Sequence, residues 1–312
     1  MELIRGLVNF KPRHRGCAAS IGNYDGVHLG HQHVLRQLVG YARALSLPAT
    51  VVVFEPMPLE YFAGAEPPAR LMNFCEKWAA LAECGVDRVA CLRFNRTLAQ
   101  MSAEMFIERV LIHDLGVRHL VVGDDFRFGR ERAGDFAMLK DAGEAYGFEV
   151  QAAHTLSVAG ERVSSGRIRG YLAAGKLGTA AGLLGMQFSL SGRVVYGDRL
   201  GHVLGYPTAN IPLKRRISPV HGIFVAAVHG IGGTTYYGAA YVGSRPTVNG
   251  QREMLEVTVF DFSGELYGQR LRVELLHQLR GDTKFENMEA LKAQITRDVG
   301  TARTWLKLQG MD

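Results

Sequence analysis

The first half of the chain alternates short apolar runs with segments whose apolar residues recur at helical spacing. Cys17–Ile21 and Thr50–Phe54 are apolar or β-branched almost throughout, as in strands that are buried on both faces. Between them, apolar side chains repeat every three or four positions, which predicts a helix over 31–45. Further segments predict strands near 87–94, 117–122 and 148–153 and helices near 74–84, 103–113 and 134–146. This alternation is typical of a parallel sheet covered by helices, with right-handed crossovers.

The pattern changes around 176–186. After Met186 come short alternating runs broken by glycine, which predict strands near 188–196, 222–229, 235–243, 254–260 and 270–277. Their spacing favours an antiparallel barrel, and residues 286–309 predict a closing helix. We therefore expect two domains, an α/β domain over 1–185 and a β-barrel domain over 186–312.

Composition fits a folded protein. The chain has 312 residues, of which 47% are hydrophobic and 21% charged, and this excludes a disordered or fibrous chain. Its 37 glycines follow no Gly-X-Y period, so they indicate turns, phosphate-facing loops, or both. The net charge is +6, with one tight basic cluster at Lys214–Arg216. A nucleic-acid binder usually concentrates its charge more strongly, whereas small anionic ligands such as nucleotides fit this mild excess.

Other features bear on the compartment and the partners. The four cysteines form no CxxC pair, which favours buried thiols in a reducing cytoplasm. The chain begins without a signal-peptide pattern, and no run of 18 apolar residues predicts a membrane span. We expect a cytoplasmic protein, a monomer or weak oligomer, that binds small molecules and neither membrane nor nucleic acid.

A first candidate site lies between the first predicted strand and the first predicted helix. There, Gly22, Gly26 and Gly30 surround His28 and His31, which lie at the helix start. Open α/β sheets bind ligands at such strand ends, and a helix N-terminus attracts phosphate. Imidazoles there can donate hydrogen bonds to phosphate oxygens during phosphoryl transfer. Two ordinary surface histidines are the alternative, but the His-x-Gly-His spacing after strand and glycine favours a functional site.

A second candidate site lies in the barrel domain. Gly197, Gly201 and Gly205 make a loop suited to phosphates, and Thr208 and Asn210 offer the hard oxygens that Mg²⁺ prefers. Ordinary barrel turns are the alternative for the glycines. Glu256 is a carboxylate on an otherwise apolar strand, and taken alone it indicates an edge residue that faces water.

One segment imitates a phosphate-binding motif. Gly170–Lys176 copies most of a P-loop, but Leu177 stands where a Ser or Thr is required. We therefore interpret Gly175 as the end of a helix.

The first site resembles the nucleotidylyltransferase superfamily, and more closely the bacterial bifunctional riboflavin kinase/FAD synthetase family. The resemblance rests on Ile21–Gln32, on Phe54–Pro58 with Met57 for the usual His, on Val121–Gly129, and on Ser164–Arg169 with Gly166 for the usual Thr. It implies a Rossmann-like fold in which His28 and His31 are catalytic. The implied ATP-binding residues here are Gly22, Asn23, Asp25, Gly30, Ser164, Ser165 and Arg169, and the implied flavin-binding residues are Asp125, Phe126 and Phe128.

The barrel domain resembles the riboflavin kinase module of the same family. Its glycine loop ends in Pro207-Thr208-Ala209-Asn210, which is the hallmark of that module. The resemblance continues through Tyr241–Thr247, where Tyr241 replaces the usual Asn, and Arg280–Phe285, where Asp282 replaces Glu. It implies that Glu256 is the general base, that Thr208 and Asn210 hold Mg²⁺, that Gly197, Gly201 and Gly205 bind ATP, and that Arg280 binds flavin.

The resemblance covers about residues 1–307 and implies two activities. The barrel domain would phosphorylate riboflavin to FMN, and the α/β domain would join FMN to AMP from a second ATP, giving FAD and pyrophosphate. Two alternatives remain at this point. One is a kinase whose α/β half is degenerate, which Met57 and Gly166 would favour. The other is a basic nucleic-acid-binding regulator that senses flavin, which Lys214–Arg216 would favour.

Overall fold

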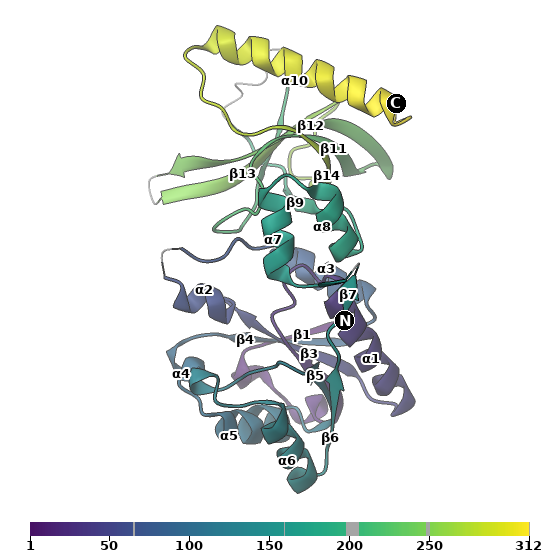
Figure 1. Ribbon diagram of the computed structural model, residues 1–312, viewed down its shortest axis with the longest axis vertical. Helices are drawn as coiled ribbons and strands as arrows, with labels where there is room; N and C mark the ends of the chain where they lie inside the picture. Colours follow the sequence, from purple (N-terminus) through teal and green to yellow (C-terminus); the bar gives the residue numbers. More distant parts are fainter. Residues whose placement is uncertain (65, 159, 198–205, 248–249, 312) are drawn as a thin grey trace. The chain divides into compact units, whose positions relative to one another are not determined.

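The structure of the chain is a computed structural model that describes residues 1–64, 66–158, 160–197, 206–247 and 250–311 (Figure 1). By their contacts, the residues form two compact units. The first unit is Met1–Pro68 with Phe74–Ser164, and the second is Ala69–Asn73 with Ser165–Asp312. The boundary expected at 185/186 stays a prediction about the catalytic modules, because contacts divide the chain by packing and not by activity.

The first unit is built on a six-stranded sheet in which all pairs of neighbours are parallel. The strand order is β1-β4-β3-β2-β5-β6. The parallel sheet expected from the sequence is thus confirmed, and β1 is an edge strand that the sequence did not predict. The strands are β1 (Glu2–Arg5), β2 (Cys17–Ile21), β3 (Ala49–Glu55), β4 (Arg88–Arg93), β5 (Val117–Gly123) and β6 (Glu149–Ala153).

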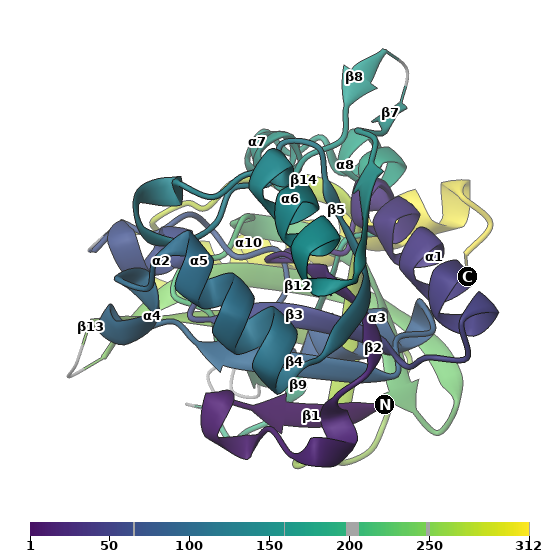
Figure 2. The ribbon, with the colours of Figure 1, turned by 90° about the horizontal axis from the view of Figure 1, so that it is seen from below.

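Helices cover both faces of this sheet. Alternate residues of β2, such as Ala19 and Ile21, pack in one apolar cluster with Val110 and Leu139 from the helices of one face. On β5, Leu120 belongs to this cluster, whereas the neighbouring His119 stacks on Tyr41 of α1, which places α1 on the opposite face. Figure 2 shows α5 and α6 together on one side of the strands. The helices are α1 (Leu29–Ala44), α2 (Pro58–Phe62), α3 (Phe74–Glu83), α4 (Arg96–Ala99), α5 (Ala103–Phe106), the π-helical η3 (Ile107–Asp114) and α6 (Phe136–Tyr146), followed by a hairpin of β7 (Ser157–Val158) and β8 (Glu161–Arg162).

The strand order creates a switch point beside β2. From β2 the chain runs through β3 to β4 on one side, and then returns to place β5 on the other side of β2. Ligands of open parallel sheets bind at the carboxyl ends of strands at such a point. Here these ends lead into the Gly22 loop after β2 and the Asp124–Gly129 loop after β5.

The second unit is an antiparallel sheet of six strands in the order β10-β13-β12-β11-β14-β9. Its two edges approach each other, because Val195, just after β9, forms a bridge with Asn210 of β10 in which its N–H donates to the Asn210 carbonyl at 2.8 Å. The expected barrel is therefore nearly closed. The elements are α7 (Ser165–Ala173), α8 (Leu177–Leu184), β9 (Ser189–Arg193), β10 (Ala209–Pro212), β11 (Gly222–Ile231), β12 (Thr234–Thr247), β13 (Gly250–Val259), β14 (Arg270–Arg280) and α10 (Met288–Leu308).

The helix α10 lies across the strands of the second unit (Figure 1), and its Ala302 and Leu306 are buried in a cluster with Val225 and Phe260. Asn287 caps its first turn by accepting a hydrogen bond from the Ala290 N–H, which explains why the helix begins there. The predicted closing helix is confirmed.

Two smaller expectations can be compared with the structure. Cys17 is buried, but Cys75 is exposed on α3, so the expectation that all four thiols are buried is wrong. Among the described residues, no helix has both the length and the apolar character that crossing a membrane requires.

Candidate active sites

The loop after β2 is held in place from within the sheet. Ser20 donates a hydrogen bond to the Val121 carbonyl at 2.5 Å, and the hydroxyl of buried Tyr24 lies 2.6 Å from the same Ser20 oxygen. Tyr24 in turn covers Gly22, where a Cβ would lie 3.0 Å from its ring. The backbone has positive φ at Tyr24, Gly26 and Val27, and this tight turn delivers His28 to the start of α1.

His28 and His31 form one unit at the N-terminus of α1. The rings stack with centroids 3.6 Å apart, and His28 Nδ1 accepts a hydrogen bond from the His31 N–H at 3.2 Å. A Cβ at Gly30 would lie 3.2 Å from His28 Nδ1, so a larger residue there would press on this contact. The structure thus brings His28, Gly30 and His31 together as the sequence predicted.

The His31 ring is held neutral. Its Nδ1 is buried and has no hydrogen-bond partner among the described residues. Burial lowers the pKa of His31 well below its usual range, and the charges of His28 and Lys77 lower it further. Lys77 is a buried cation on α3 that the sequence analysis did not single out, because a lysine on a helix is normally solvated.

A cavity of about 700 Å³ opens at the carboxyl ends of these strands. Five of the predicted residues line it: Gly22, Asn23, Asp125, Phe126 and Phe128. Phe126 and Phe128 stack with centroids 5.6 Å apart. Much of the aromatic wall was not predicted from the sequence: it also includes Phe62 and Phe94, whose ring centroids are 5.7 Å apart. Such a wall suits a flat aromatic ring.

The remaining residues predicted for the first site lie outside this lining. Asp25 is buried in the loop before α1, and Ser164 is the last residue of the first unit. Ser165 and Arg169 lie on α7 in the second unit, where Arg169 Nε donates to the Ala69 carbonyl at 2.7 Å. The ATP-binding role expected for these residues stays a prediction.

Met57 and Gly166, which depart from the pattern of the resembled family, can be placed in the structure. Met57 is buried as the N-cap residue of α2, and its N–H donates to the Glu60 carboxylate at 2.9 Å. It does not appear in the cavity lining. A Cβ at Gly166 would meet nothing within 4 Å, so the glycine is not required by packing there.

In the second unit, strand register gathers residues from distant parts of the chain. Tyr241 of β12 lies directly opposite Glu256 of β13, and Glu256 lies opposite Asn210 of β10. On the other side, Tyr241 pairs with Ile223, which pairs with Arg280. Residues directly opposite in antiparallel strands share a face of the sheet. The register therefore aligns Arg280, Tyr241, Glu256 and Asn210 in one row across the barrel.

The Glu256 carboxylate lines a cavity of about 590 Å³ under α10. Arg245 holds it with two hydrogen bonds to Oε1, from Nε at 3.1 Å and from Nη2 at 2.5 Å. The rest of the wall is mostly apolar and includes Ile223, Leu291 and Val299. A carboxylate at the edge of an apolar cavity can act as a base toward a hydroxyl of a largely aromatic ligand.

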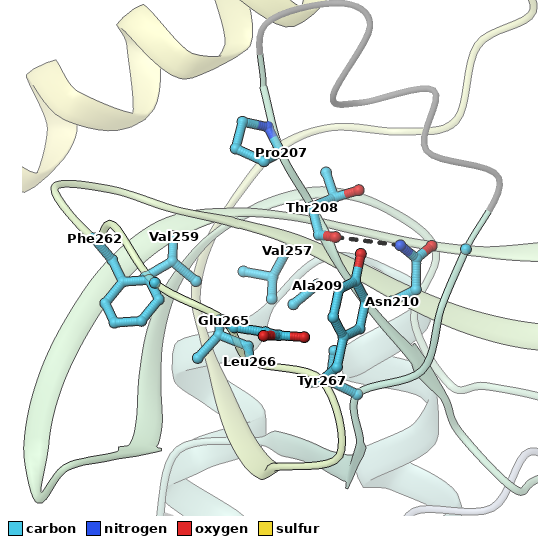
Figure 3. Close-up of a pocket in the computed structure, with 13 residues that line it drawn as sticks. Pro207, Thr208, Ala209, Asn210, Val257, Val259, Phe262, Glu265, Leu266 and Tyr267 are labelled. Atoms are coloured by element: carbon cyan, nitrogen blue, oxygen red, sulfur yellow. Dashed lines mark hydrogen bonds between the residues drawn. The ribbon is translucent and has the colours of Figure 1, made fainter.

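A second cavity of about 380 Å³ lies beside Thr208 and Asn210 (Figure 3). Asn210 Nδ2 donates to the Thr208 carbonyl at 3.2 Å, while its Oδ1 is buried without a hydrogen-bond partner among the described residues. Gly197 also lines this cavity, and a Cβ there would lie 2.5 Å from the Asn210 amide. Thr208 lines both this cavity and the one that holds Glu256. Gly201 and Gly205 lie outside the described residues.

Arg280 lines the larger cavity, but its donors are directed at other protein groups. Nε and Nη2 bind the Asp298 carboxylate on α10 at 2.8–3.1 Å, and Nη1 donates to the Gly281 carbonyl and to Thr283. This arrangement supports a role in holding α10 over the cavity, and the flavin contact expected for Arg280 stays a prediction.

Two other predicted features can be placed. Gly175 has φ +70°, the Gly175 N–H donates to Leu172, and the Lys176 N–H donates to Tyr171, so Gly175 terminates α7 as interpreted from the sequence. In the basic cluster, Arg215 is buried and donates to the carbonyls of Arg70 and Leu71. Only Lys214 and Arg216 of this cluster are exposed, which weakens the case for a nucleic-acid surface.

Comparison with known proteins covers both units. A family model described as FAD synthetase matches residues 10–167, and one described as riboflavin kinase matches residues 184–306. The chain is 47% identical over 309 residues to a bifunctional riboflavin kinase/FMN adenylyltransferase of Escherichia coli K12, covering 99% of each chain. It is 48% identical over 304 residues to the protein of the same name from Pseudomonas fluorescens, covering 97% of each.

The fold also matches a solved structure. A crystal structure titled as a macrolide-efflux protein from Streptococcus pneumoniae aligns with a TM-score of 0.78 and 28% sequence identity, over 98% of this chain and 100% of that one. Both family regions are thus present in this chain, in the order that the sequence motifs indicated. The chain belongs to the family of bifunctional riboflavin kinases/FMN adenylyltransferases.

Proposed function

We propose that the second unit phosphorylates riboflavin with ATP to give FMN and ADP, and that the first unit transfers AMP from a second ATP to FMN, giving FAD and pyrophosphate. One observation carries the assignment of the kinase site. Thr208 lines two cavities, one of which holds Glu256 and the other Asn210. Two substrates bound in the two cavities would meet at Thr208, as a phosphoryl transfer requires.

The kinase step follows from the contents of each cavity. Riboflavin occupies the apolar cavity under α10 with its 5′-hydroxyl at Glu256, and ATP occupies the cavity beside Thr208. Glu256 takes the hydroxyl proton while the 5′-oxygen forms a bond to the γ-phosphorus and the bond to the ADP oxygen breaks. Arg245 fixes one carboxylate oxygen, which orients the other toward the substrate.

The residues beside Thr208 fit a magnesium ion. Mg²⁺ prefers hard oxygen ligands and takes few from the protein when phosphates and water supply the rest. The buried Oδ1 of Asn210 is such an oxygen, and the Thr208 hydroxyl is a second. When bound there, Mg²⁺ would neutralise phosphate charge during the transfer. We propose Gly197 as part of the ATP loop, together with Gly201 and Gly205.

The adenylyl step needs alignment more than a base. A phosphate oxygen of FMN is already anionic, so it can attack the α-phosphorus of ATP directly, and pyrophosphate leaves. The aromatic wall of the first unit, with Phe126, Phe128 and Asp125 from the predicted set, is proposed to hold the flavin. His28 and His31 at the N-terminus of α1, together with Gly22, Asn23, Asp25 and Gly30, are proposed to bind ATP and stabilise the charge that develops. Ser164, Ser165 and Arg169 complete the proposed ATP set.

The same proposal covers the setting of the enzyme. Because ATP is its co-substrate, we place the enzyme in the cytoplasm. We also propose that it works on small molecules as a monomer or weak oligomer.

The test separates the two activities. Glu256→Gln should abolish FMN formation from riboflavin and ATP while FMN is still converted to FAD, because the base serves only the kinase step. His28→Ala with His31→Ala should abolish FAD formation while FMN accumulates. Both products are measured by chromatography of timed reactions with Mg²⁺.

A matched control tests whether replacing any partly buried carboxylate on a strand of this sheet would impair the enzyme. Glu274 on β14 pairs with Arg272 at 3.1 Å, has an exposure close to that of Glu256, and lines neither of the kinase cavities. Glu274→Gln should leave both activities intact. Loss of both products in a folded Glu256→Gln protein would contradict the two-site proposal.

A further inference from the structure

Tyr241 is an unexpected residue beside the proposed base of the kinase. It replaces the Asn that is usual in the resembled family, and it lies directly opposite Glu256 in the β12–β13 register. Both side chains line the cavity proposed for riboflavin. A change of side chain at this place therefore alters the surroundings of the reacting hydroxyl.

The ring of Tyr241 lies along its own strand. Tyr241, Gly243 and Arg245 share one face of β12, because strand side chains alternate. A Cβ built on Gly243 would lie 2.1 Å from the Tyr241 hydroxyl oxygen and 2.3 Å from the ring carbon that carries it. The phenol thus occupies the space that any larger residue at 243 would need, and Gly243 permits this position.

The hydroxyl of Tyr241 is anchored at its far end. Its Oη donates to Asp282 Oδ2 at 3.3 Å, and Asp282 Oδ1 accepts from the Thr283 N–H at 2.9 Å. Burial raises the pKa of Tyr241 to about 12, and the Asp282 charge adds to this, so the phenol keeps its proton at neutral pH. With that proton directed at Asp282, the phenolic oxygen offers its lone pairs to another donor.

We propose that Tyr241 Oη accepts a hydrogen bond from one of the secondary hydroxyls of the ribityl chain, and that Tyr241 is thereby a specificity-determining residue of the kinase site. The inference rests on the proposed function. The ribityl chain is a polyol, so it presents O–H donors at successive carbons. With the 5′-hydroxyl at Glu256, a hydroxyl further along the chain reaches the neighbouring Tyr241. The amide of Asn would offer both a donor and an acceptor to the ribityl chain. Tyr241, whose proton is directed at Asp282, offers only an acceptor, so it favours a ribityl hydroxyl that donates.

The experiment compares riboflavin with its 2′-, 3′- and 4′-deoxy analogues as substrates of the full chain. We expect the wild type to show a KM about three- to tenfold higher for one of these analogues, which corresponds to one lost hydrogen bond. Tyr241→Phe should raise the KM for riboflavin by a similar factor and should no longer distinguish riboflavin from that analogue. The change should be larger in KM than in kcat.

Controls make the result specific. Tyr236→Phe alters a tyrosine of the same strand that is not part of the cavity lining, so it should discriminate among the analogues as the wild type does. FMN adenylylation by Tyr241→Phe should match the wild type, because Tyr241 belongs to the second unit. Failure of the wild type to make FMN at all would overturn the proposed function, which is a different outcome from the one tested here.

Gly243→Ala supplies a second variant that retains the hydroxyl. Its Cβ would displace the phenol from Asp282, so we expect the same loss of discrimination. It should have no additional effect on discrimination in the Tyr241→Phe background. The inference is overturned if the KM values of Tyr241→Phe for the three analogues differ from its KM for riboflavin as they do in the wild type. It is also overturned if Gly243→Ala leaves these KM differences unchanged.

Discussion

Arg245 donates two hydrogen bonds to a single oxygen of Glu256, Oε1, from Nε at 3.1 Å and from Nη2 at 2.5 Å. The pair is largely shielded from water, since the side chains are 33% and 18% exposed. Both residues line the cavity proposed for riboflavin. The arrangement fixes the direction of the carboxylate as well as its charge, and in our proposal it leaves Oε2 to receive the hydroxyl proton.

Arg245→Met is predicted to impair the kinase by misorienting its base. The Met side chain matches the Arg245 stem as far as the ε position but lacks the guanidinium donors, so we expect kcat for riboflavin phosphorylation to fall by roughly tenfold or more, with a smaller change in KM. Initial rates of FMN formation at saturating ATP measure this. Arg272→Met, which removes one of the two partners of Glu274 on β14 (the other is His229), is the matched control and should change neither constant. An unchanged kcat in Arg245→Met would contradict a positioning role.

Asp298→Asn is predicted to loosen α10. Asp298 is buried and accepts three hydrogen bonds from Arg280, whose side chain is 22% exposed. Because one partner of a mostly buried pair remains charged, we expect a loss of about 1–3 kcal/mol in the free energy of unfolding by urea. The control is Asp261→Asn, which breaks an exposed pair between Asp261 and Arg303 of the same helix and should have no measurable effect. Equal effects of the two variants would contradict the argument from burial.

The architecture was largely predictable because strand and helix periods are local. β2 and β3 are apolar runs buried on both faces, and this pattern can be recognised in the sequence without knowing which strands pair with them. β10 was missed for the opposite reason. Its four residues include a proline, and they form a strand only because Glu256 and its neighbours on β13 pair with them.

The candidate sites were predictable where one motif carries the chemistry. His28 and His31 are three positions apart on one helix start, so their stacking follows from the sequence spacing. The meeting of Tyr241, Glu256 and Asn210 depends instead on register between three strands. The hydrogen bonds between Arg280 and Asp298 likewise depend on where α10 lies, and no local sequence pattern specifies this.

His31 is predicted to make the first unit less stable in acid. Burial keeps the pKa of folded His31 well below 6.5, the usual value, to which it returns on unfolding. The unfolded chain therefore binds a proton below about pH 6.5 that the folded chain does not bind, so the free energy of unfolding is fully present above that pH and declines below it. Urea unfolding between pH 5 and 7.5, followed by the fluorescence of Trp78 in a Trp305→Phe background, measures this. His31→Asn should give a flatter profile below pH 6.5, and parallel profiles would contradict the prediction.

Asn210 is predicted to determine the Mg²⁺ requirement of the kinase. Its Nδ2 is bound to the Thr208 carbonyl at 3.2 Å, which fixes the orientation of the amide and leaves the buried Oδ1 as an oxygen without a protein partner in the described part of the chain. A chelator should abolish FMN formation by the wild type. Asn210→Ala removes the oxygen, so the Mg²⁺ concentration for half-maximal FMN formation should rise about tenfold, the effect of one lost ligand contact of about 1.4 kcal/mol. The conversion of FMN to FAD in the same protein should keep its wild-type Mg²⁺ dependence, because Asn210 belongs to the second unit. If both activities shifted together, or if kinase activity fell without any change in its Mg²⁺ dependence, Asn210 would be a structural residue of β10 and the metal site would lie elsewhere.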